Sequence, residues 1–288
     1  MRIQHIQVKD VNKNGVAWYG FKREGCPKTI SVQSRRECEL AREKGAHFYS
    51  ERECEVDSFL SVLAEIKKEN VTLLDLGTGW GEWVLALAGA VKNKLVPMTI
   101  RNYKGVAVEC DKYFYDYAWG NFASNKINAI AVYGAVGKYN GETRVNVGYL
   151  SQKCCASSLS FGGYFSGSKL FALISGAYHF LSRKTDKVPM FCIDYLIEEH
   201  LYGKVDIITM DIQGTEVMAI EGMEKSLDNI GYMMIGTHGE SIHEKVKNLL
   251  QGQFEFIVDA PPNRITGIND SYAVICQRGQ DGILLCKS

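Results

Sequence analysis

The chain has 288 residues, 46% hydrophobic and 23% charged, which is ordinary for a globular protein long enough to bury a large core. Its 33 basic residues equal its 33 acidic residues, so net charge gives no reason to expect binding to nucleic acid or to an anionic membrane. The sequence contains no run of about 18 apolar residues and no apolar segment at its N-terminus. We therefore expect neither a membrane span nor a signal peptide.

The nine cysteines follow no framework spacing. Their number is odd, and the adjacent pair Cys154 and Cys155 fits neither a CxxC redox motif nor a zinc knuckle. We expect free thiols in a reducing compartment and a cytoplasmic location.

Short apolar runs alternate with helical patterns from residue 71 onward. Strands are predicted at 71–76, 105–110, 128–137, 204–211 and 231–239. Helices are predicted at 81–91, 112–124, 215–227 and 241–251. Two further strands, 254–260 and 271–277, precede a short apolar run, GILLC, near the end of the chain.

This alternation predicts an α/β fold built from βαβ units, with a mostly parallel, Rossmann-like sheet and α-helices on both faces. No clear helical pattern separates 254–260 from 271–277. We therefore expect a C-terminal antiparallel hairpin at one edge of the sheet.

Two regions lie outside the alternation. Residues 1–55 are polar and include an Arg/Glu-rich stretch that could be one helix; we treat them as an N-terminal extension of unknown role, ahead of a main domain over 56–288. Residues 139–188 form an insertion whose segment SSLSFGGYFSGS is too loose for a core. We expect this insertion to be a lid or an acceptor wall.

The stretch VTLLDLGTGWGEW, residues 71–83, places glycine at every second position after a buried strand. A dinucleotide fingerprint would need a third glycine at position 82, which is Glu82. No Lys-Ser/Thr pair follows, so a phosphate loop is also excluded. A carboxylate at the helix start would repel a phosphate, so the loop is suited to a ligand without one.

The pattern D-x-G-x-G-x-G resembles the cofactor loop of class I S-adenosylmethionine (SAM) methyltransferases. The resemblance implies that Asp75 meets the cofactor's ammonium directly or through water, and that Glu109, at the end of the second strand, accepts from the two ribose hydroxyls. The expected cofactor-binding residues are Asp75, Gly77, Thr78, Gly79, Gly81, Glu109, Ala135 and Asp211. The alternative is a tight strand-to-helix turn with a solvated Glu109.

Three later blocks narrow the resemblance. VPMFCIDYLIEEH, KVDIITMDIQGTEVMAIEGM and IGTHG resemble signature segments of the FkbM-type methyltransferase family, over roughly 70–275. Gln213 stands where glutamate is more frequent, while the acid–glycine–acid core of Asp211, Gly214 and Glu216 is intact. The resemblance implies methyl transfer, usually to oxygen and often on a sugar or secondary metabolite.

Asp211, His238 and Glu216 are the candidate catalytic residues. Asp211 and His238 end neighbouring strands of the family's sheet, so they could face one acceptor, with the imidazole as general base. Each residue has a structural alternative: Asp211 could cap the next helix, His238 could be a satisfied polar group, and Glu216 could serve the helix dipole. Asp211 and His238 are also possible Mg²⁺ ligands, although a metal-free reaction is favoured because the sequence shows no tight ligand cluster.

The sequence thus predicts a SAM-dependent O-methyltransferase for a hydroxylated small molecule, with no nucleic-acid or membrane partner and a possible homodimer. Two alternatives remain at this point. One is an N-methyltransferase, in which proton removal is less demanding. The other is a catalytically silent SAM-binding or scaffold protein.

Overall fold

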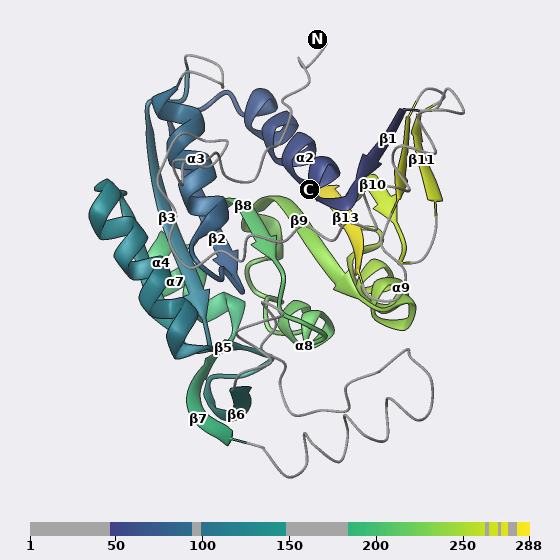
Figure 1. Cartoon of the computed structure of the whole chain (residues 1–288). Coiled ribbons are helices and arrows are strands. Elements are labelled where there is room, and N and C mark those ends of the chain that lie inside the picture. Colours follow the sequence, from purple (N-terminus) through teal and green to yellow (C-terminus); the bar gives the residue numbers. More distant parts are fainter. Residues whose placement is uncertain (1–46, 94–98, 148–183, 263–264, 270–271, 276–280) are drawn as a thin grey trace.

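The computed structural model describes residues 47–93, 99–147, 184–262, 265–269, 272–275 and 281–288 (Figure 1). Most of the predicted N-terminal extension and the central part of the predicted insertion lie outside these residues. The expectation of a lid carrying Phe161, Tyr164 and Phe165 therefore also falls outside them. In the described part of the chain, no helix is both long and apolar enough to cross a membrane.

A seven-stranded sheet forms the centre of the molecule, in the order β10-β13-β9-β8-β2-β3-β4. The strands are β2 (Asn70–Leu76), β3 (Asn102–Glu109), β4 (Ala129–Tyr133), β8 (Val205–Met210), β9 (Ile230–His238), β10 (Glu255–Ala260) and β13 (Asp281–Lys287). Neighbouring strands from β4 to β9 are parallel, whereas β13 is antiparallel to both of its neighbours, β9 and β10. The predicted mostly parallel sheet with a C-terminal antiparallel element is confirmed.

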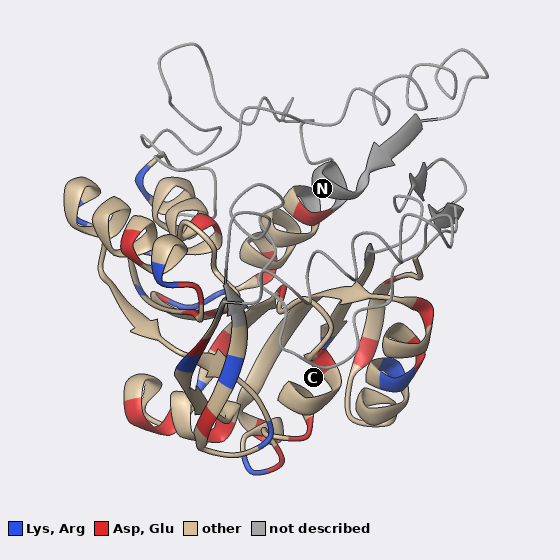
Figure 2. Ribbon diagram, turned by 60° about the horizontal axis from the view of Figure 1, so that its bottom comes forward, with Lys and Arg blue, Asp and Glu red and all other residues tan. Residues whose placement is uncertain are grey.

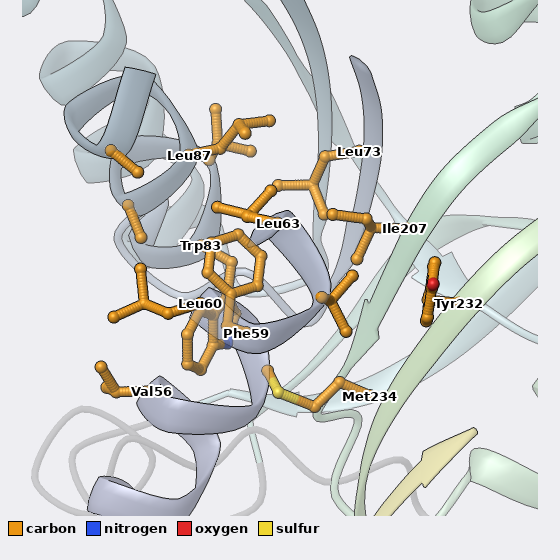
Figure 3. Close-up of a cluster of buried hydrophobic side chains, with 14 of the residues drawn as sticks. Val56, Phe59, Leu60, Leu63, Leu73, Trp83, Leu87, Ile207, Tyr232 and Met234 are labelled. Carbon is orange, nitrogen blue, oxygen red and sulfur yellow. The ribbon is translucent and has the colours of Figure 1, made fainter. Parts of the chain in front are cut away.

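Helices cover both faces of this sheet, as predicted. One face packs against α2 (Glu51–Glu65), α3 (Glu82–Lys92) and α4 (Lys112–Asn125), and the other against α7 (Ile193–Leu201), α8 (Glu216–Ile220) and α9 (Glu240–Leu250). Side chains alternate across β2, so Leu73 joins the first core while Leu74 and Leu76 join the second. Figure 3 shows the first core, where the rings of Phe59 and Trp83 lie 5.0 Å apart between centroids.

The predicted strand 128–137 is two strands. β4 ends at Tyr133, and after Gly134 the chain leaves the central sheet as β5 (Ala135–Val136). β5 pairs with β7 (Lys184–Phe191), which also pairs with β6 (Gly141–Val147), giving a separate sheet. A Cβ on Gly134 would lie 2.6 Å from the Phe191 ring, so the bare backbone permits this close passage. Both ends of the predicted insertion are thus regular strands.

The predicted helix 215–227 is also shorter than expected. α8 ends at Ile220, and a short 3₁₀ helix, η1 (Leu227–Asn229), precedes β9. A Cβ on Gly222 would lie 2.5 Å from the Gly137 carbonyl oxygen, so the chain packs here against the loop after β5. Tertiary packing overrides the helical spacing of the apolar residues.

The antiparallel edge is formed by a different strand from the one predicted. β10 pairs with β13, whereas β12 (Tyr272–Ile275) joins β1 (His47–Ser50) and β11 (Ile265–Asn269) in a second small sheet. Ile283, Leu284 and Leu285 of β13 are at most 1% exposed and contribute to both cores. A strand that is apolar on both sides belongs inside a sheet, which explains why GILLC separates β10 from β9.

β2 and β8 are neighbours in the middle of the sheet. From β2 the chain continues outward to β3 in one direction, and from β8 it continues outward to β9 in the opposite direction, so the strand order reverses between β2 and β8. In an open α/β sheet this switch point is where ligands bind. In Figure 1 it lies toward β5 and α8. Figure 2 turns this side forward and shows acidic and basic positions interspersed on the visible elements, in keeping with the balanced composition.

Candidate active site

A pocket of about 580 Å³, counting its open mouth, lies at the carboxyl ends of β2, β3 and β8. Residues from four segments surround it. They are Gly77, Gly79 and Trp80; Val108, Glu109, Cys110 and Phe114; Gly134, Ala135 and Val136; and Asp211, Ile212, Gln213 and Thr215. The pocket thus occupies the switch point and lies against the glycine loop.

The glycine loop adopts a backbone that side chains disfavour. Gly77, Gly79 and Gly81 have φ values of 75°, 56° and 91°. The amides of Gly77 and Thr78 both donate to the carbonyl of Val108, at 3.0 and 3.1 Å, which ties the loop to the end of β3. The sequence therefore folds here into a tight turn that brings bare backbone to the pocket.

The three glycines serve different purposes. A Cβ on Gly77 would lie 1.9 Å from the Asp211 carbonyl oxygen, and one on Gly81 would lie 2.5 Å from the Phe122 ring. A Cβ on Gly79 would meet nothing within 4 Å, and Gly79 lines the pocket. Gly77 and Gly81 are needed for packing, whereas Gly79 keeps space open for a ligand.

Glu109 is buried at the end of β3, with 6% exposure, and faces the pocket. Its Oε2 accepts from the Gly79 amide at 2.9 Å, and its Oε1 accepts from the Asp111 amide at 2.8 Å. Burial raises the pKa of this carboxyl to about 7, although the backbone hydrogen bonds oppose the shift. The alternative of a solvated Glu109 does not describe this geometry.

Asp75 lies beneath the loop and outside the lining of the pocket. Its Oδ2 accepts from the Thr78 hydroxyl at 2.5 Å and its Oδ1 from the Thr209 hydroxyl at 2.8 Å. Burial raises its pKa to about 6, against the effect of these two hydrogen bonds. Asp75 and Thr78 therefore shape the loop, which favours an indirect role for Asp75 over direct contact with a ligand. Ala135, by contrast, lines the pocket as predicted.

Sequence reasoning missed several pocket residues. Trp80 and Phe114 contribute aromatic surface, with ring centroids 6.4 Å apart, while Cys110 follows Glu109 directly. The position of Trp80 inside the glycine loop was an available signal for it. Phe114 lay hidden in an aromatic-rich helix, where spacing alone does not tell which ring faces a pocket.

The three predicted catalytic residues meet at the ends of β8 and β9. His238 Nε2 lies 3.3 Å from Asp211 Oδ1, and His238 Nδ1 lies 2.7 Å from Glu216 Oε1. Asp211 lines the pocket with a side chain 56% exposed, whereas the side chain of His238 is 13% exposed and Glu216 is fully buried. Asp211 therefore faces the pocket, and His238 and Glu216 lie behind it.

Glu216 does more than occupy the first turn of α8. Its Oε1 accepts from the Gly214 amide at 3.0 Å in addition to contacting His238, and its Oε2 is buried without a hydrogen-bond partner among the described residues. A carboxylate taken fully out of water is costly unless it is compensated by hydrogen bonds or by an opposite charge. The imidazole of His238 is the compensating group.

His238 is held between two carboxylates. Burial alone would lower the pKa of its imidazole, but hydrogen bonds to Asp211 and Glu216 outweigh burial and raise the pKa well above its usual value. The two carboxylates therefore favour the protonated form of the ring. A role of His238 as general base stays a prediction.

The pocket suits the nucleoside and amino acid parts of SAM. The open space at Gly79 and the buried carboxylate of Glu109 are the features that such a ligand needs, and apolar surface from Phe114 and Val136 is available for a purine. Among the described residues, no three His, Cys, Asp or Glu side chains form a group that could hold a metal ion. Whether Asp211 and His238 bind Mg²⁺ stays a question for experiment.

The strand order, the glycine loop and the acidic end of β3 together define a class I SAM-dependent methyltransferase fold. The sequence profile of the methyltransferase FkbM domain matches residues 89–258, which is more than half of the chain. The protein therefore belongs to the FkbM-domain family of SAM-dependent methyltransferases. No curated protein matches the chain.

Solved structures with a similar arrangement include other methyltransferases. The METTL16 methyltransferase domain is 14% identical, with 99% of this chain and 86% of that chain covered and a TM-score of 0.44. A precorrin-6y C5,15-methyltransferase from Geobacter metallireducens is 12% identical, with 81% and 87% covered and a TM-score of 0.38. TrmK of M. capricolum, solved with S-adenosylhomocysteine, is 9% identical, with 79% and 66% covered and a TM-score of 0.35. The class assignment rests on the strand order and the family match.

Proposed function

We propose that the protein methylates a hydroxyl group of a small molecule, such as a sugar or a secondary metabolite. The observation that carries this proposal is the carboxylate of Asp211 at the pocket wall, backed by His238 and by the buried Glu216. A hydroxyl must lose a proton when it is methylated, and the cluster offers a place for that proton. A hydroxylated small molecule as acceptor, a cytoplasmic location and a homodimer remain predictions.

Asp211 is the group in the cluster that reaches the pocket, so we assign it the contact with the acceptor. SAM, when bound, supplies an electrophilic methyl group on a sulfonium with a thioether as leaving group. Asp211 orients the acceptor hydroxyl and takes its proton as the oxygen forms the new C–O bond, while the electrons of the broken C–S bond stay on sulfur. Glu109 would hold the ribose hydroxyls, and the bare backbone at Gly79 would border the methionine part.

His238 then has a different role from the predicted general base. As an imidazolium it cannot take a proton, but it balances the two carboxylates on either side of it. Its contact to Asp211 Oδ1 fixes the orientation of that carboxylate. After Asp211 accepts a proton, its half-exposed carboxyl group can release that proton to water, which returns the cluster to its resting charge.

The test is a transfer assay with purified protein, labelled SAM and a panel of sugars, phenols, aliphatic alcohols and amines. We expect label in an O-methyl product, identified by mass spectrometry and by the methyl resonance, and a strong loss of turnover in Asp211→Asn. Asp116→Asn, the same change at an exposed position on α4, is the matched control and should keep full turnover.

Two outcomes would replace this proposal. Label on an amine, with Asp211→Asn still active, would indicate an N-methyltransferase, because an amine can lose its proton to water after transfer. Tight SAM binding without transfer to any member of a broad panel would favour the silent SAM-binding alternative.

A further inference from the structure

Gln213 stands out in the active-site turn because of its backbone. Its φ of 53° is left-handed, a conformation that residues other than glycine rarely adopt. The residue lines the pocket, two positions after Asp211. Strained backbone of this kind persists only where surrounding contacts hold it, and such positions concentrate at functional sites.

The side chain of Gln213 contacts the proposed catalytic carboxylate. Its Nε2 donates to Asp211 Oδ1 at 2.8 Å. The same oxygen lies 3.3 Å from His238 Nε2, on the neighbouring strand. Two donors that converge on one carboxylate oxygen from different elements restrict the rotation of the Asp211 carboxyl group, which neither donor would do alone.

The contacts of the turn close a ring. Gln213 donates to Asp211, which contacts His238; His238 contacts Glu216, and Glu216 accepts from the amide of Gly214, the residue after Gln213. A hydrogen bond from the Thr215 hydroxyl to the Ile212 carbonyl, at 3.0 Å, braces the same turn. The left-handed backbone of Gln213 is what lets its side chain turn back toward Asp211 while the next amide points to Glu216.

We propose that Gln213 is a positioning residue, which fixes the Asp211 carboxylate in the orientation that meets the acceptor. This inference rests on the proposed function of Asp211. The amide is suited to the task because it donates a hydrogen bond without adding charge. Glutamate, which is more frequent at this position in the family, could not donate a hydrogen bond when ionised, so the donated bond is a feature of a chain with glutamine here. Gln213→Glu therefore tests whether this chain depends on donation or only on the size of the side chain.

The first experiment needs no acceptor. The side-chain amide of Gln213 is observed by ¹⁵N–¹H NMR and assigned through its loss in Gln213→Gly. A donated hydrogen bond shifts the donating amide proton from its ordinary position, and Asp211→Ala should return both protons to the values of solvent-exposed glutamine. Identical shifts in the wild type and Asp211→Ala would refute the contact.

The second experiment measures turnover in three variants. Glycine adopts the left-handed backbone freely, so Gln213→Gly should keep the thermal midpoint and the SAM affinity of the wild type while kcat falls about 10- to 100-fold, the scale expected when a reacting group is misplaced by about 1 Å. Gln213→Glu, which loses the donor at nearly constant size, should also lower kcat. Gln213→Asn, which keeps a shorter amide and tolerates the backbone, should recover part of the rate.

The outcomes separate the two claims. Equal kcat in the wild type, Gln213→Gly and Gln213→Glu would overturn the positioning role even with the NMR contact present. A fall in SAM affinity that accounts for the whole loss would also overturn it, because it would show that the turn serves the cofactor. If the NMR contact is found but no hydroxyl acceptor is methylated, the proposed O-methylation fails while the Gln213–Asp211 contact stands.

Discussion

The buried carboxyl of Glu109 should make cofactor binding depend on pH. Burial raises its pKa from 4.5 to about 7 in the free protein. Ribose hydroxyls donate hydrogen bonds, so they bind best to the ionised carboxylate, which can accept on both oxygens. Cofactor binding therefore favours ionisation, and a proton leaves Glu109 on binding whenever the free protein holds it protonated.

The size of the effect follows from this pKa. With a pKa of about 7, roughly half of the free protein is ionised at pH 7, about 90% at pH 8 and about 1% at pH 5. If only the ionised form binds, the affinity for SAM falls about tenfold per pH unit below 7, or about 100-fold between pH 8 and pH 5. A 100-fold change in affinity corresponds to about 2.8 kcal/mol of binding free energy, at about 1.4 kcal/mol per tenfold.

The stability of the free protein should change in the opposite direction. A carboxyl with a folded pKa above its unfolded pKa contributes stability that is complete below the unfolded value and is lost as pH rises through the folded value. For Glu109 this window runs from about 4.5 to about 7, and Asp75, raised from 3.8 to about 6, adds to it. Raising the pH should therefore lower the free energy of unfolding of the free protein and raise its affinity for the cofactor.

The assay is calorimetry of S-adenosylhomocysteine binding from pH 5 to pH 8, repeated in two buffers with different ionisation enthalpies to count released protons. Glu109→Gln cannot ionise, so it should bind more weakly at pH 8 and lose the pH dependence. The control is Asp116→Asn, which removes an exposed carboxylate on α4 and should keep the wild-type slope. A wild-type affinity that is flat from pH 5 to pH 8, or an unchanged slope in Glu109→Gln, would refute the reasoning.

Three further predictions concern the loop, the cluster and the metal. Gly77→Ala should destabilise the fold strongly, because its Cβ would lie 1.9 Å from the Asp211 carbonyl oxygen. Gly79→Ala should lower the free energy of unfolding by only about 1–2 kcal/mol, through backbone strain, yet bind S-adenosylhomocysteine about tenfold more weakly. Thermal melts and calorimetry distinguish the two variants, and normal binding by Gly79→Ala would contradict the assigned ligand space. Asp211→Asn should lower kcat by about 10²–10⁴ and His238→Gln by less, both with unchanged cofactor affinity; a larger loss in His238→Gln would restore histidine as the base. EDTA should leave turnover unchanged, and a loss that Mg²⁺ restores would show that metal is required.

Local patterns in the sequence were sufficient for most of the central fold. Apolar runs of strand length, each followed by a helical pattern, specify parallel βαβ units, and their right-handed crossovers leave few ways to order the strands. The break after β4 was not predictable in this way, because apolar residues continue on both sides of Gly134 and nothing in their pattern shows that β5 pairs with β7 rather than with β3. The pairing is decided by the small core of Ala135, Val145 and Val188, whose members are distant in sequence.

The candidate site divides along the same line. Residues fixed by a local motif, such as Gly79 and Glu109, lie at the pocket where the resemblance implies they should. The electrostatic state of His238 depends instead on two carboxylates from the turn and the helix after β8, whose hydrogen bonds raise its pKa well above the ordinary value. Charge states of buried clusters follow from three-dimensional neighbours, so a motif can locate such a group without fixing what it does.

The cofactor loop and the catalytic turn are joined where β2 and β8 lie side by side. The Asp211 amide donates to the Leu76 carbonyl at 2.9 Å, and the carbonyl of Asp211 occupies the space that a Cβ on Gly77 would need. A shift of the loop on cofactor binding therefore acts on the backbone of Asp211 directly, without an intervening side chain. Gln213 and His238 contact the side-chain carboxylate of the same residue. Asp211 is therefore held at its backbone by the cofactor loop and at its side chain by these two residues. This arrangement gives a physical reason for the bare backbone at Gly77: it lets the glycine loop rest on Asp211, the residue that we propose meets the acceptor.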